Sequence, residues 1–492
     1  MKATVRALDE SRWTVVALAI AGFAITFLQS LAFVRLAGHT FAEHAAFGYS
    51  LIADATLNAA LFAPPVHPET VAGYLELRAF APLSILFAAW ALVAGMRSST
   101  TPVIPRATAF AIGAMLAAAA ACLGALVGAG PVSGLGLVET WALLVVLATA
   151  CFAISACLGP FAPPVILALF FINSLSRVFT QLEALRWLSP FRYYDLSTAL
   201  PRDGHFDVGG FVVLLAITAI GVGVAHVLPA PRARSGPTSA RLLAVPVLRE
   251  LYPQRLALAE WCVAFAVLGI ALTAATRTTM QDLLALPRGL PGLPQYIFFF
   301  FASAIDATWF GVTLLMFVAL TFAFVMRWAD DDRSGRLEAT LSAPYSRSAL
   351  VIERLAALAL TSTVLAALSG IAVALTASTS NIALDQRHLA EACLLLALFG
   401  VVLGAAALSF VSWWPRGATI LFGAVVLAAY LADQIGSPLG LPAWAQNVSP
   451  FRLAGAPVAL GLDNHSLALL IAIGVAGIGS SILLFQRRDV GV

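Results

Sequence analysis

The chain has 492 residues, of which 61% are hydrophobic and 11% are charged, and its formal net charge is +3. Soluble domains are about half apolar and about a quarter charged, so this composition excludes a water-soluble fold and predicts a protein that lies in lipid. The small, scattered charge excludes a nucleic-acid-binding surface. Lys2 is the only lysine. Because a P-loop needs a lysine after its glycines to reach the phosphates, the chain has no ATP-binding P-loop of its own.

Twelve windows are apolar and long enough to cross a bilayer, which takes about 20 residues per helix. They lie at 13–36, 77–96, 107–129, 138–158, 161–180, 208–229, 257–276, 302–326, 349–377, 389–413, 417–435 and 466–485. The sequence therefore predicts an all-α integral membrane protein of about twelve transmembrane helices. With both termini in the cytoplasm, most of the 28 basic residues fall in cytoplasmic segments, as the positive-inside rule requires. We expect a multi-pass protein of a bacterial cell (inner) membrane with this orientation.

The chain repeats itself at long range. Residues 189–192 read Ser-Pro-Phe-Arg and recur at 449–452, and the same spacing matches 203–205 to 463–465, each with Asp first and His last. Met-Arg, which closes the second window at 96–97, recurs at the end of the eighth at 326–327. Such duplicated halves are common in transporters, with the pathway between them. We predict three parts: a first six-span half at 1–229, a cytoplasmic linker with an interfacial helix at 230–256, and a second six-span half at 257–492.

One long charged loop, at 327–354, lies inside a half. Leu337 and Leu341 are four residues apart, so they share a face of a short helix, which Pro344 should end before Arg347 begins the next span. A short helix across the inner mouth of the bundle is suited to dock in a groove of a cytoplasmic partner. The alternative is a solvated loop with ordinary charges.

This loop resembles the coupling-helix region of type-2 ABC exporter permeases, in which an acidic residue and a glycine precede Leu-Glu, and a proline and an arginine precede the next span. The ending Phe-Gln-Arg-Arg-Asp at 485–489 is similar to the usual ending of these permeases, and the two-half layout resembles the polyketide and tetronasin antibiotic exporters. The residues for which the resemblance implies a role in coupling to an ATPase are Asp332, Gly335, Leu337, Glu338, Leu341, Pro344 and Arg347.

The resemblance implies the membrane-spanning permease subunit of an ATP-driven exporter, without a catalytic, metal or cofactor site in this chain. ATP and Mg would bind to a separate cytoplasmic ABC ATPase subunit, in two copies. The substrates would be amphipathic drugs, antibiotics or lipid-like compounds, and membrane lipids would surround the permease. The first half departs from the pattern, since eight residues separate Arg97 from Arg106 where nineteen separate Arg327 from Arg347. About eleven residues that match the coupling helix are missing there.

Two alternatives remain open at this stage. Residues 332–336 read Asp-Arg-Ser-Gly-Arg, similar to the signature loop of major facilitator transporters, although Trp328 replaces its expected glycine and the first-half loop lacks the motif. The second alternative is a membrane enzyme with a metal on Asp330, Asp331 and Asp332, which would need further ligands.

Aromatic side chains dominate the windows that would face a central path. The possible substrate-path residues are Phe170, Phe171, Asn173, Trp309, Phe310, Phe317 and Tyr430. A packing or lipid-facing role is the alternative for each. The ionisable residues within or beside the windows are Arg177, Glu260, Asp306, Glu353, Glu391 and Asp433. Charged groups at such places are usually functional or paired, and because most lie near a span end, capping or snorkelling can also explain them.

Overall fold

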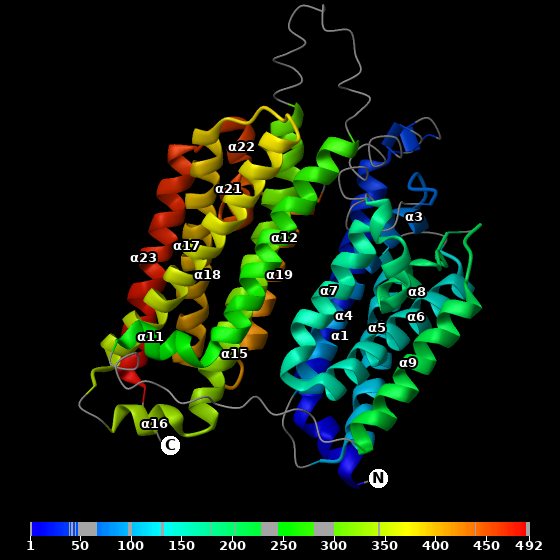
Figure 1. Ribbon diagram of the computed structural model, residues 1–492, viewed down its shortest axis with the longest axis horizontal. Coiled ribbons are helices and arrows are strands. Elements are labelled where there is room, and N and C mark those ends of the chain that lie inside the picture. Colours follow the sequence, from blue (N-terminus) through cyan, green and yellow to red (C-terminus); the bar gives the residue numbers. More distant parts are fainter. Residues whose placement is uncertain are drawn as a thin grey trace, which may run out of the picture. The chain divides into compact units, whose positions relative to one another are not determined.

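The structure is a computed structural model (Figure 1). It describes residues 2–38, 40, 43–44, 46–47, 66–96, 101–128, 132–177, 179–201, 203–227, 245–279, 300–342, 345–437 and 439–488. Within these ranges every regular element is a helix, and the only strand-like pairing is one antiparallel bridge between Thr198 and His205. The chain divides into two compact units, Met1–Arg234 with Pro438–Gly440 and Ser235–Ser437 with Leu441–Val492.

Eleven helical segments in the described part of the chain are long and apolar enough to cross a membrane, which confirms a multi-helix membrane protein. The exception among the twelve windows is the fifth, where α7 (Ala162–Leu175) has only 14 residues. It follows a 3₁₀ turn, η2 (Gly159–Phe161), that contains the Gly-Pro step. A helix of this length rises about 21 Å, less than the roughly 30 Å hydrocarbon core. The window at 161–180 is therefore only partly helical.

The first unit packs its helices closely through small residues. Its elements are α1 (Lys2–Leu36), α3 (Val71–Leu75), η1 (Glu76–Phe80), α4 (Ala81–Met96), α5 (Val103–Gly128), α6 (Gly134–Leu158), η2, α7, η3 (Thr180–Leu182), η4 (Ala184–Leu188), α8 (Pro190–Asp195) and α9 (Val208–Val227). A Cβ on Gly124 of α5 would lie 2.4 Å from the carbonyl oxygen of Phe23 in α1. Thr26 uses this close approach to donate a 2.7 Å hydrogen bond to the Ala121 carbonyl. Small residues and hydroxyls of this kind hold helices together in lipid, where the hydrophobic effect between helices is lost.

The second unit is built around α18. Its elements are α11 (Pro246–Leu251), η5 (Tyr252–Gln254), α12 (Arg255–Thr279), η6 (Asp306–Phe310), α15 (Gly311–Arg333), α16 (Arg336–Leu341), α17 (Arg347–Thr379), α18 (Gln386–Trp413), α19 (Ala418–Ile435), α20 (Ala443–Asn447), α21 (Pro450–Ala454), α22 (Pro457–Leu460) and α23 (Asn464–Arg487). Helices α15, α17, α19 and α23 all pack against α18. Ser409 of α18 bonds both the Gly477 carbonyl, at 3.0 Å, and Ser480, at 2.8 Å, in α23. These hydrogen bonds fix one pair of neighbouring helices.

Each unit interrupts one long helix with a π-helical segment that begins with a carboxylate. These segments are η1, which starts at Glu76, and η6, which starts at Asp306. The Asp306 carboxylate, 7% exposed, accepts hydrogen bonds from the backbone N–H groups of Val458 (3.0 Å) and Ala459 (2.7 Å). Glu76 similarly interacts with the backbone N–H of Leu200. Since π segments are rare and frequent at functional sites, we infer that both halves use a buried carboxylate to hold the chain segment that precedes the last helix.

The repeated Ser-Pro segments each begin a short helix, α8 or α21, and both serines are buried. Ser189 accepts a hydrogen bond from the N–H of Phe191 at 3.2 Å, whereas Ser449 donates one to the Ala429 carbonyl at 2.8 Å. The segments are therefore similar in course but differ in their hydrogen bonds.

The Asp–His match downstream of the Ser-Pro segments is wrong in register. Asp463 caps α23 by accepting from the N–H of Ser466 at 3.0 Å, and the equivalent cap of α9 is Asp207, which accepts from Gly210 at 2.7 Å. Asp203 instead lies in the turn closed by the Thr198–His205 bridge. That turn adds four residues before α9 and shifts the match.

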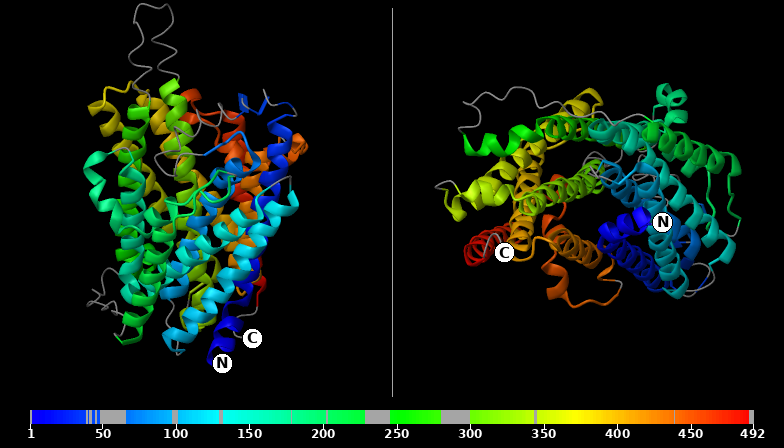
Figure 2. Two further views of the ribbon diagram at one scale, coloured as in Figure 1. Left: turned by 90° about the vertical axis from the view of Figure 1, so that its right-hand side faces the viewer. Right: turned by 90° about the horizontal axis from the view of Figure 1, so that it is seen from below.

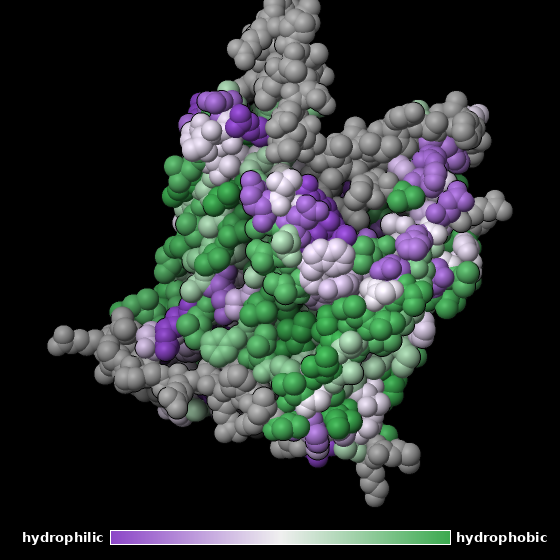
Figure 3. All heavy atoms as spheres, turned by 45° about the vertical axis from the view of Figure 1, so that its right-hand side comes forward, coloured by the Kyte–Doolittle hydropathy of each residue, from purple (hydrophilic) through white to green (hydrophobic). Residues whose placement is uncertain are grey.

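The helices of each unit run side by side (Figure 2). Hydrophobic side chains cover much of the face drawn in Figure 3, and hydrophilic ones form separate patches, the larger of them in its upper half. Such a surface suits lipid over its hydrophobic part and water at its hydrophilic patches. The cytoplasmic orientation of the termini stays a prediction.

Replacing Asp306 by alanine should destabilise the second unit, because two backbone N–H donors at the start of α22 would lose their acceptor. We expect the free energy of unfolding to fall by roughly 2 kcal/mol or more, measured by denaturation of the purified chain in detergent. Asp306→Asn keeps one acceptor oxygen, so its free energy of unfolding should fall by less. The exposed Glu338→Ala is the control, and equal stability of Asp306→Ala and this control would contradict the assignment.

Candidate functional site

The predicted coupling segment forms a short helix that follows a sharp turn. Helix α15 ends at Arg333, Gly335 adopts a left-handed conformation with φ of +73°, and α16 begins at Arg336. Hydrogen bonds from the N–H groups of Ser334 and Gly335 to the carbonyls of Asp330 and Asp332 close the turn. Glycine adopts this conformation without a steric penalty, so it allows α16 to leave the axis of α15.

Helix α16 presents one buried side chain and two exposed charges, those of Arg336 and Glu338. Leu337 is 3% exposed, Leu341 is half-buried, and Glu338 is exposed. The predicted shared face of the two leucines is therefore present, with Leu337 as its anchor. Pro344 lies outside the described residues. Helix α16 lies at the end of the second unit where the C-terminus also lies (Figure 1).

A buried ion pair lies at the base of this turn. Arg354 of α17 binds Asp331 of α15 at 3.1 Å, and their side chains are 5% and 15% exposed. The Arg354 guanidinium also lies over the Trp328 ring, 5.9 Å from its centroid. Trp328 in turn donates a 3.2 Å hydrogen bond to Glu250 of α11. We name this set, Glu250, Trp328, Asp331 and Arg354, the Arg354 cluster, and it joins α11, α15 and α17.

A second carboxylate, Glu353, binds the neighbouring residues of α11 and of the α16–α17 connection. Arg249 donates two hydrogen bonds to it, at 3.2 and 2.7 Å, and the Tyr345 hydroxyl donates a third. The guanidinium of Arg249 lies 4.9 Å from the centroid of the Tyr345 ring. Burial and the hydrogen bond to Glu353 raise the pKa of Tyr345 above its usual value. Arg249, in the linker and interfacial helix predicted at 230–256, thus forms its hydrogen bonds within the chain.

The C-terminal end of α23 is bound to the same region. Arg347, at the start of α17, donates to the carbonyls of Phe485 (3.4 Å), Gln486 (3.0 Å) and Arg488 (2.5 Å). Arg488 forms an ion pair with Asp332. The two segments that carry the family resemblance are therefore hydrogen-bonded to each other, through residues that are 138 to 156 positions apart in the chain.

Five of the seven predicted coupling residues divide into two groups. Asp332, Gly335, Leu337 and Arg347 position α16 through contacts within the chain, and Glu338 is the predicted charge left exposed. Sequence reasoning missed the cluster partners Arg249, Glu250 and Arg354. The sequence signal for this cluster was Glu353, an ionisable residue at the end of a predicted span. Helix capping explains a charge at that place equally well.

The predicted path residues of the second unit are closely packed in this structure. Trp309, Phe310 and Phe317 are at most 1% exposed. The indole N–H of Trp309 donates to Ser369 at 2.8 Å, and Phe317 lies edge-on to Phe265 with ring centroids 5.1 Å apart. These contacts show a packing role, and the role of these residues in a substrate path stays a prediction.

The remaining path residues contact the Ser-Pro segments. Phe170, beside the buried Phe171, and Tyr430 lie edge-on to the phenylalanines of the two segments, with centroids 5.3 and 5.5 Å apart. Asn173, 2% exposed, donates a 2.6 Å hydrogen bond to Asp195. Phe170 and Asn173 therefore lie against α8, and Tyr430 lies against α21.

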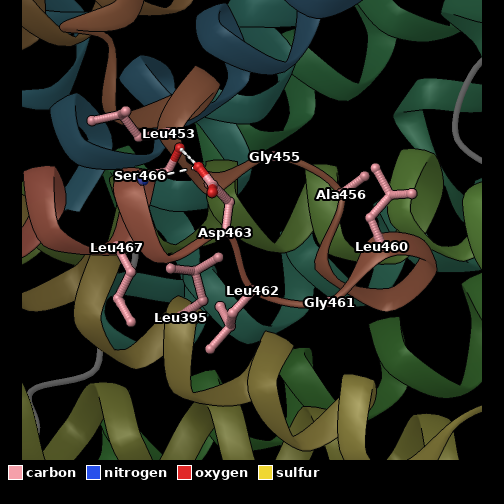
Figure 4. Close-up of a pocket in the computed structure, with 11 residues that line it drawn as sticks. Leu395, Leu453, Gly455, Ala456, Leu460, Gly461, Leu462, Asp463, Ser466 and Leu467 are labelled. Carbon is pink, nitrogen blue, oxygen red and sulfur yellow. Dashed lines mark hydrogen bonds between the residues drawn. The ribbon is translucent and has the colours of Figure 1, made fainter.

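A cavity of about 130 Å³ opens beside α23 in the second unit (Figure 4). At its rim the Ser466 hydroxyl and N–H donate to Asp463 and lower the pKa of that carboxyl. Binding pockets for drug-sized ligands measure roughly 300–1,000 Å³, so this cavity is too small for a drug. Its lining residues are Leu395, Leu453, Ala454, Gly455, Ala456, Leu460, Gly461, Leu462, Asp463, Ser466 and Leu467.

The carboxylates at 330–332 do not converge on one point. Asp331 binds Arg354, and Asp332 binds Arg488. Among the residues that the structure describes, no group of three His, Cys, Asp or Glu side chains could hold a metal ion. This geometry gives no support to a metal enzyme.

Comparison with known families bears on the second half of the chain. Residues 246–486, nearly half of the sequence, match the family model described as multidrug efflux system permease Rv1217c, C-terminal domain. This half resembles a multidrug efflux permease. The matched range runs from α11 to α23 and contains the Arg354 cluster and α16, and it supports an ABC-type efflux permease with a transport rather than a catalytic role. No curated protein matches the chain.

Replacing Arg354 by methionine should strongly destabilise the second unit, because Asp331 would remain buried without its cation. Breaking a buried pair in this way costs roughly 3–5 kcal/mol, to be measured by thermal unfolding of the purified chain. The double variant Arg354→Met/Asp331→Leu removes both charges and should recover a large part of the loss. Arg336, 70% exposed and 3.8 Å from Asp331, provides the control. Arg336→Met should change stability little, and a loss equal to that of Arg354→Met would contradict the importance of the buried pair.

Proposed function

We propose that this chain is the membrane-spanning subunit of an ATP-driven exporter of the polyketide and tetronasin type. A separate cytoplasmic ABC ATPase, in two copies, would bind ATP and Mg and drive the export of amphipathic drugs, antibiotics or lipid-like compounds. The observation that carries the proposal is α16, a short helix with the exposed charge of Glu338, held on a network of charged side chains. The match to a multidrug efflux permease over the same residues supports it.

The contacts of the residues on either side of α16 would let this helix transmit motion to the spans. A docking helix can pass force to the spans only if its base moves with them. Asp331 and Asp332, just before the turn, bind α17 and the end of α23, and Tyr345 and Arg347, just after it, bind Glu353 and the α23 carbonyls. A push on α16 would therefore act on α15, α17 and α23 together. In this proposal α16 faces the cytoplasm of a bacterial cell, as do both termini.

The first half has a shorter connection with which an ATPase could make contact. Only six residues, 97–102, separate α4 from α5, too few for a turn and a helix like α16. Arg106 holds the start of α5 against the end of α4 by donating to the carbonyls of Ala94 (2.8 Å) and Gly95 (3.1 Å). We therefore propose asymmetric docking, in which one ATPase copy binds mainly through 330–346 and the other makes fewer contacts.

The energy source separates this proposal from the facilitator alternative. We expect efflux from cells or inverted vesicles to stop when vanadate traps the ATPase, and to continue when a protonophore collapses the proton gradient while ATP is maintained. The readout is retention of a fluorescent amphipathic drug, with cells lacking the chain as the baseline. Efflux that survives vanadate but stops with the protonophore would contradict the proposal and favour proton-coupled transport.

Reversing the charge of Glu338 should weaken the complex with the ATPase. Glu338→Arg places like charges together if the partner groove supplies a cation, and repulsion of this kind can cost several kcal/mol. We expect permease-stimulated ATP hydrolysis and co-purification of the ATPase to fall at least about tenfold, with unchanged stability of the isolated chain. The matched control is Asp203→Arg, another exposed carboxylate, in the turn before α9 of the first unit. Equal activity of the two variants would refute docking through Glu338.

A further inference from the structure

Three arginines converge beside α7 and α8 in the first unit. Arg177 forms an ion pair with Asp195, Arg186 donates to Asn173 at 3.2 Å, and Arg192 lies over the Trp187 ring, 4.9 Å from its centroid. We name Arg177, Arg186 and Arg192 the arginine cluster. Burial and repulsion by Arg192 and Arg177 lower the pKa of Arg186, against the attraction of Asp195 and Glu183. Within the cluster, repulsion between like charges is thus appreciable.

Several N–H groups of the arginine cluster have no hydrogen-bond partner among the described residues. The Arg177 side chain is 11% exposed, yet among the described residues its Nε and Nη1 are buried without a hydrogen-bond partner, as is Nε of Arg192. Glu76 also has a buried carboxylate oxygen without a partner, and the charge that acts on it is Asp195. Unsatisfied donors on buried cations are costly. Several such donors on neighbouring arginines therefore suggest that an anion occupies this place.

The second half holds the corresponding segment, before its Ser-Pro repeat, with fewer arginines. At the spacing of the Ser-Pro repeat, Arg186 corresponds to Gln446 and Arg177 to Ser437. Gln446 accepts hydrogen bonds from Arg452 (2.5 Å) and Ser437 (3.0 Å) and donates one to the Leu441 carbonyl at 2.7 Å. That network is closed and needs only one arginine. Arg177 has a partner in Asp195, which corresponds to Gly455 in the second half. The comparison therefore shows only that the fold of the segment does not require Arg186, which points to binding as the role of Arg186.

Apolar side chains surround the cluster on the exposed side. Leu185, Trp187 and Leu188 of η4 are 44%, 51% and 67% exposed. Tryptophan and leucine beside cations are typical of the membrane–water interface, where the rings lie at the level of the lipid headgroups. Arginine binds phosphate through paired N–H groups. We propose that the arginine cluster binds the phosphate of an anionic phospholipid, whose acyl chains contact the apolar side chains of η4.

The proposal can be tested without transport, through Trp187 as a reporter. The full chain is placed in phosphatidylcholine nanodiscs and titrated with brominated phosphatidylglycerol or brominated phosphatidylcholine. The Trp187→Phe variant isolates the quenching of this one residue. We expect brominated phosphatidylglycerol to quench Trp187 at least about tenfold more effectively in the wild type than in Arg186→Gln, since one charged hydrogen bond is worth about tenfold or more in affinity.

The controls distinguish the lipid from other occupants. Arg186→Gln copies the residue of the second half and should fold, which the melting temperature checks. Arg452→Gln, the same type of substitution in the second half, should leave the quenching unchanged. Excess inorganic phosphate should not prevent the quenching; full competition by it would assign the site to a free anion and overturn the lipid. Equal quenching by both lipids, or undiminished quenching of Arg186→Gln, would show ordinary lipid contact and refute the site.

Discussion

The guanidinium of Arg354 lies inside the helix bundle of the second unit, where a charge needs a partner because water is excluded. Asp331 supplies that partner from the last turn of α15, and the requirement fixes the distance between α15 and α17 at the point where the chain turns into α16. The neighbouring interactions of Glu353, Arg347 and Asp332 add α11 and the end of α23 to the same network. The orientation of α16, and with it the exposure of Glu338, depends on this one neutralised charge.

The same constraint acts at the other end of the helices. Backbone N–H groups in lipid must find acceptors within the protein, and the segments around α22 and Leu200 are too short to satisfy themselves. A carboxylate at the start of a π segment serves each half, Asp306 in one and Glu76 in the other. The halves then differ in the side chains that bind around the Ser-Pro segments. In the second half Gln446 closes a hydrogen-bond network around one arginine. The first half gathers three arginines, and some of their N–H groups have no partner among the described residues.

Much of this architecture could be predicted from the sequence, because long apolar windows allow few structures other than membrane-spanning helices. The position of α16 also follows from local signals, namely Gly335 and the spacing of Leu337 and Leu341. The roles of Asp332 and Arg347 could not be predicted, since their partners lie near residue 488, far along the chain. The π segments were missed because one extra residue per turn leaves no mark on a uniformly apolar pattern. The Asp203 match failed because a local turn changed the register by four residues.

Helix α17 runs for 33 residues from Arg347 to Thr379 without a proline, a length of about 50 Å against a hydrocarbon core of about 30 Å. It is therefore a stiff rod that begins at the α16 connection and ends beyond the opposite side of the apolar layer. A tilt of only 5° about its first turn would displace its far end by about 4 Å. A small rotation of α17 at its α16 end can thus move its other end by about the width of a methylene chain. No loop interrupts α17 between the two ends, so the movement is not absorbed on the way.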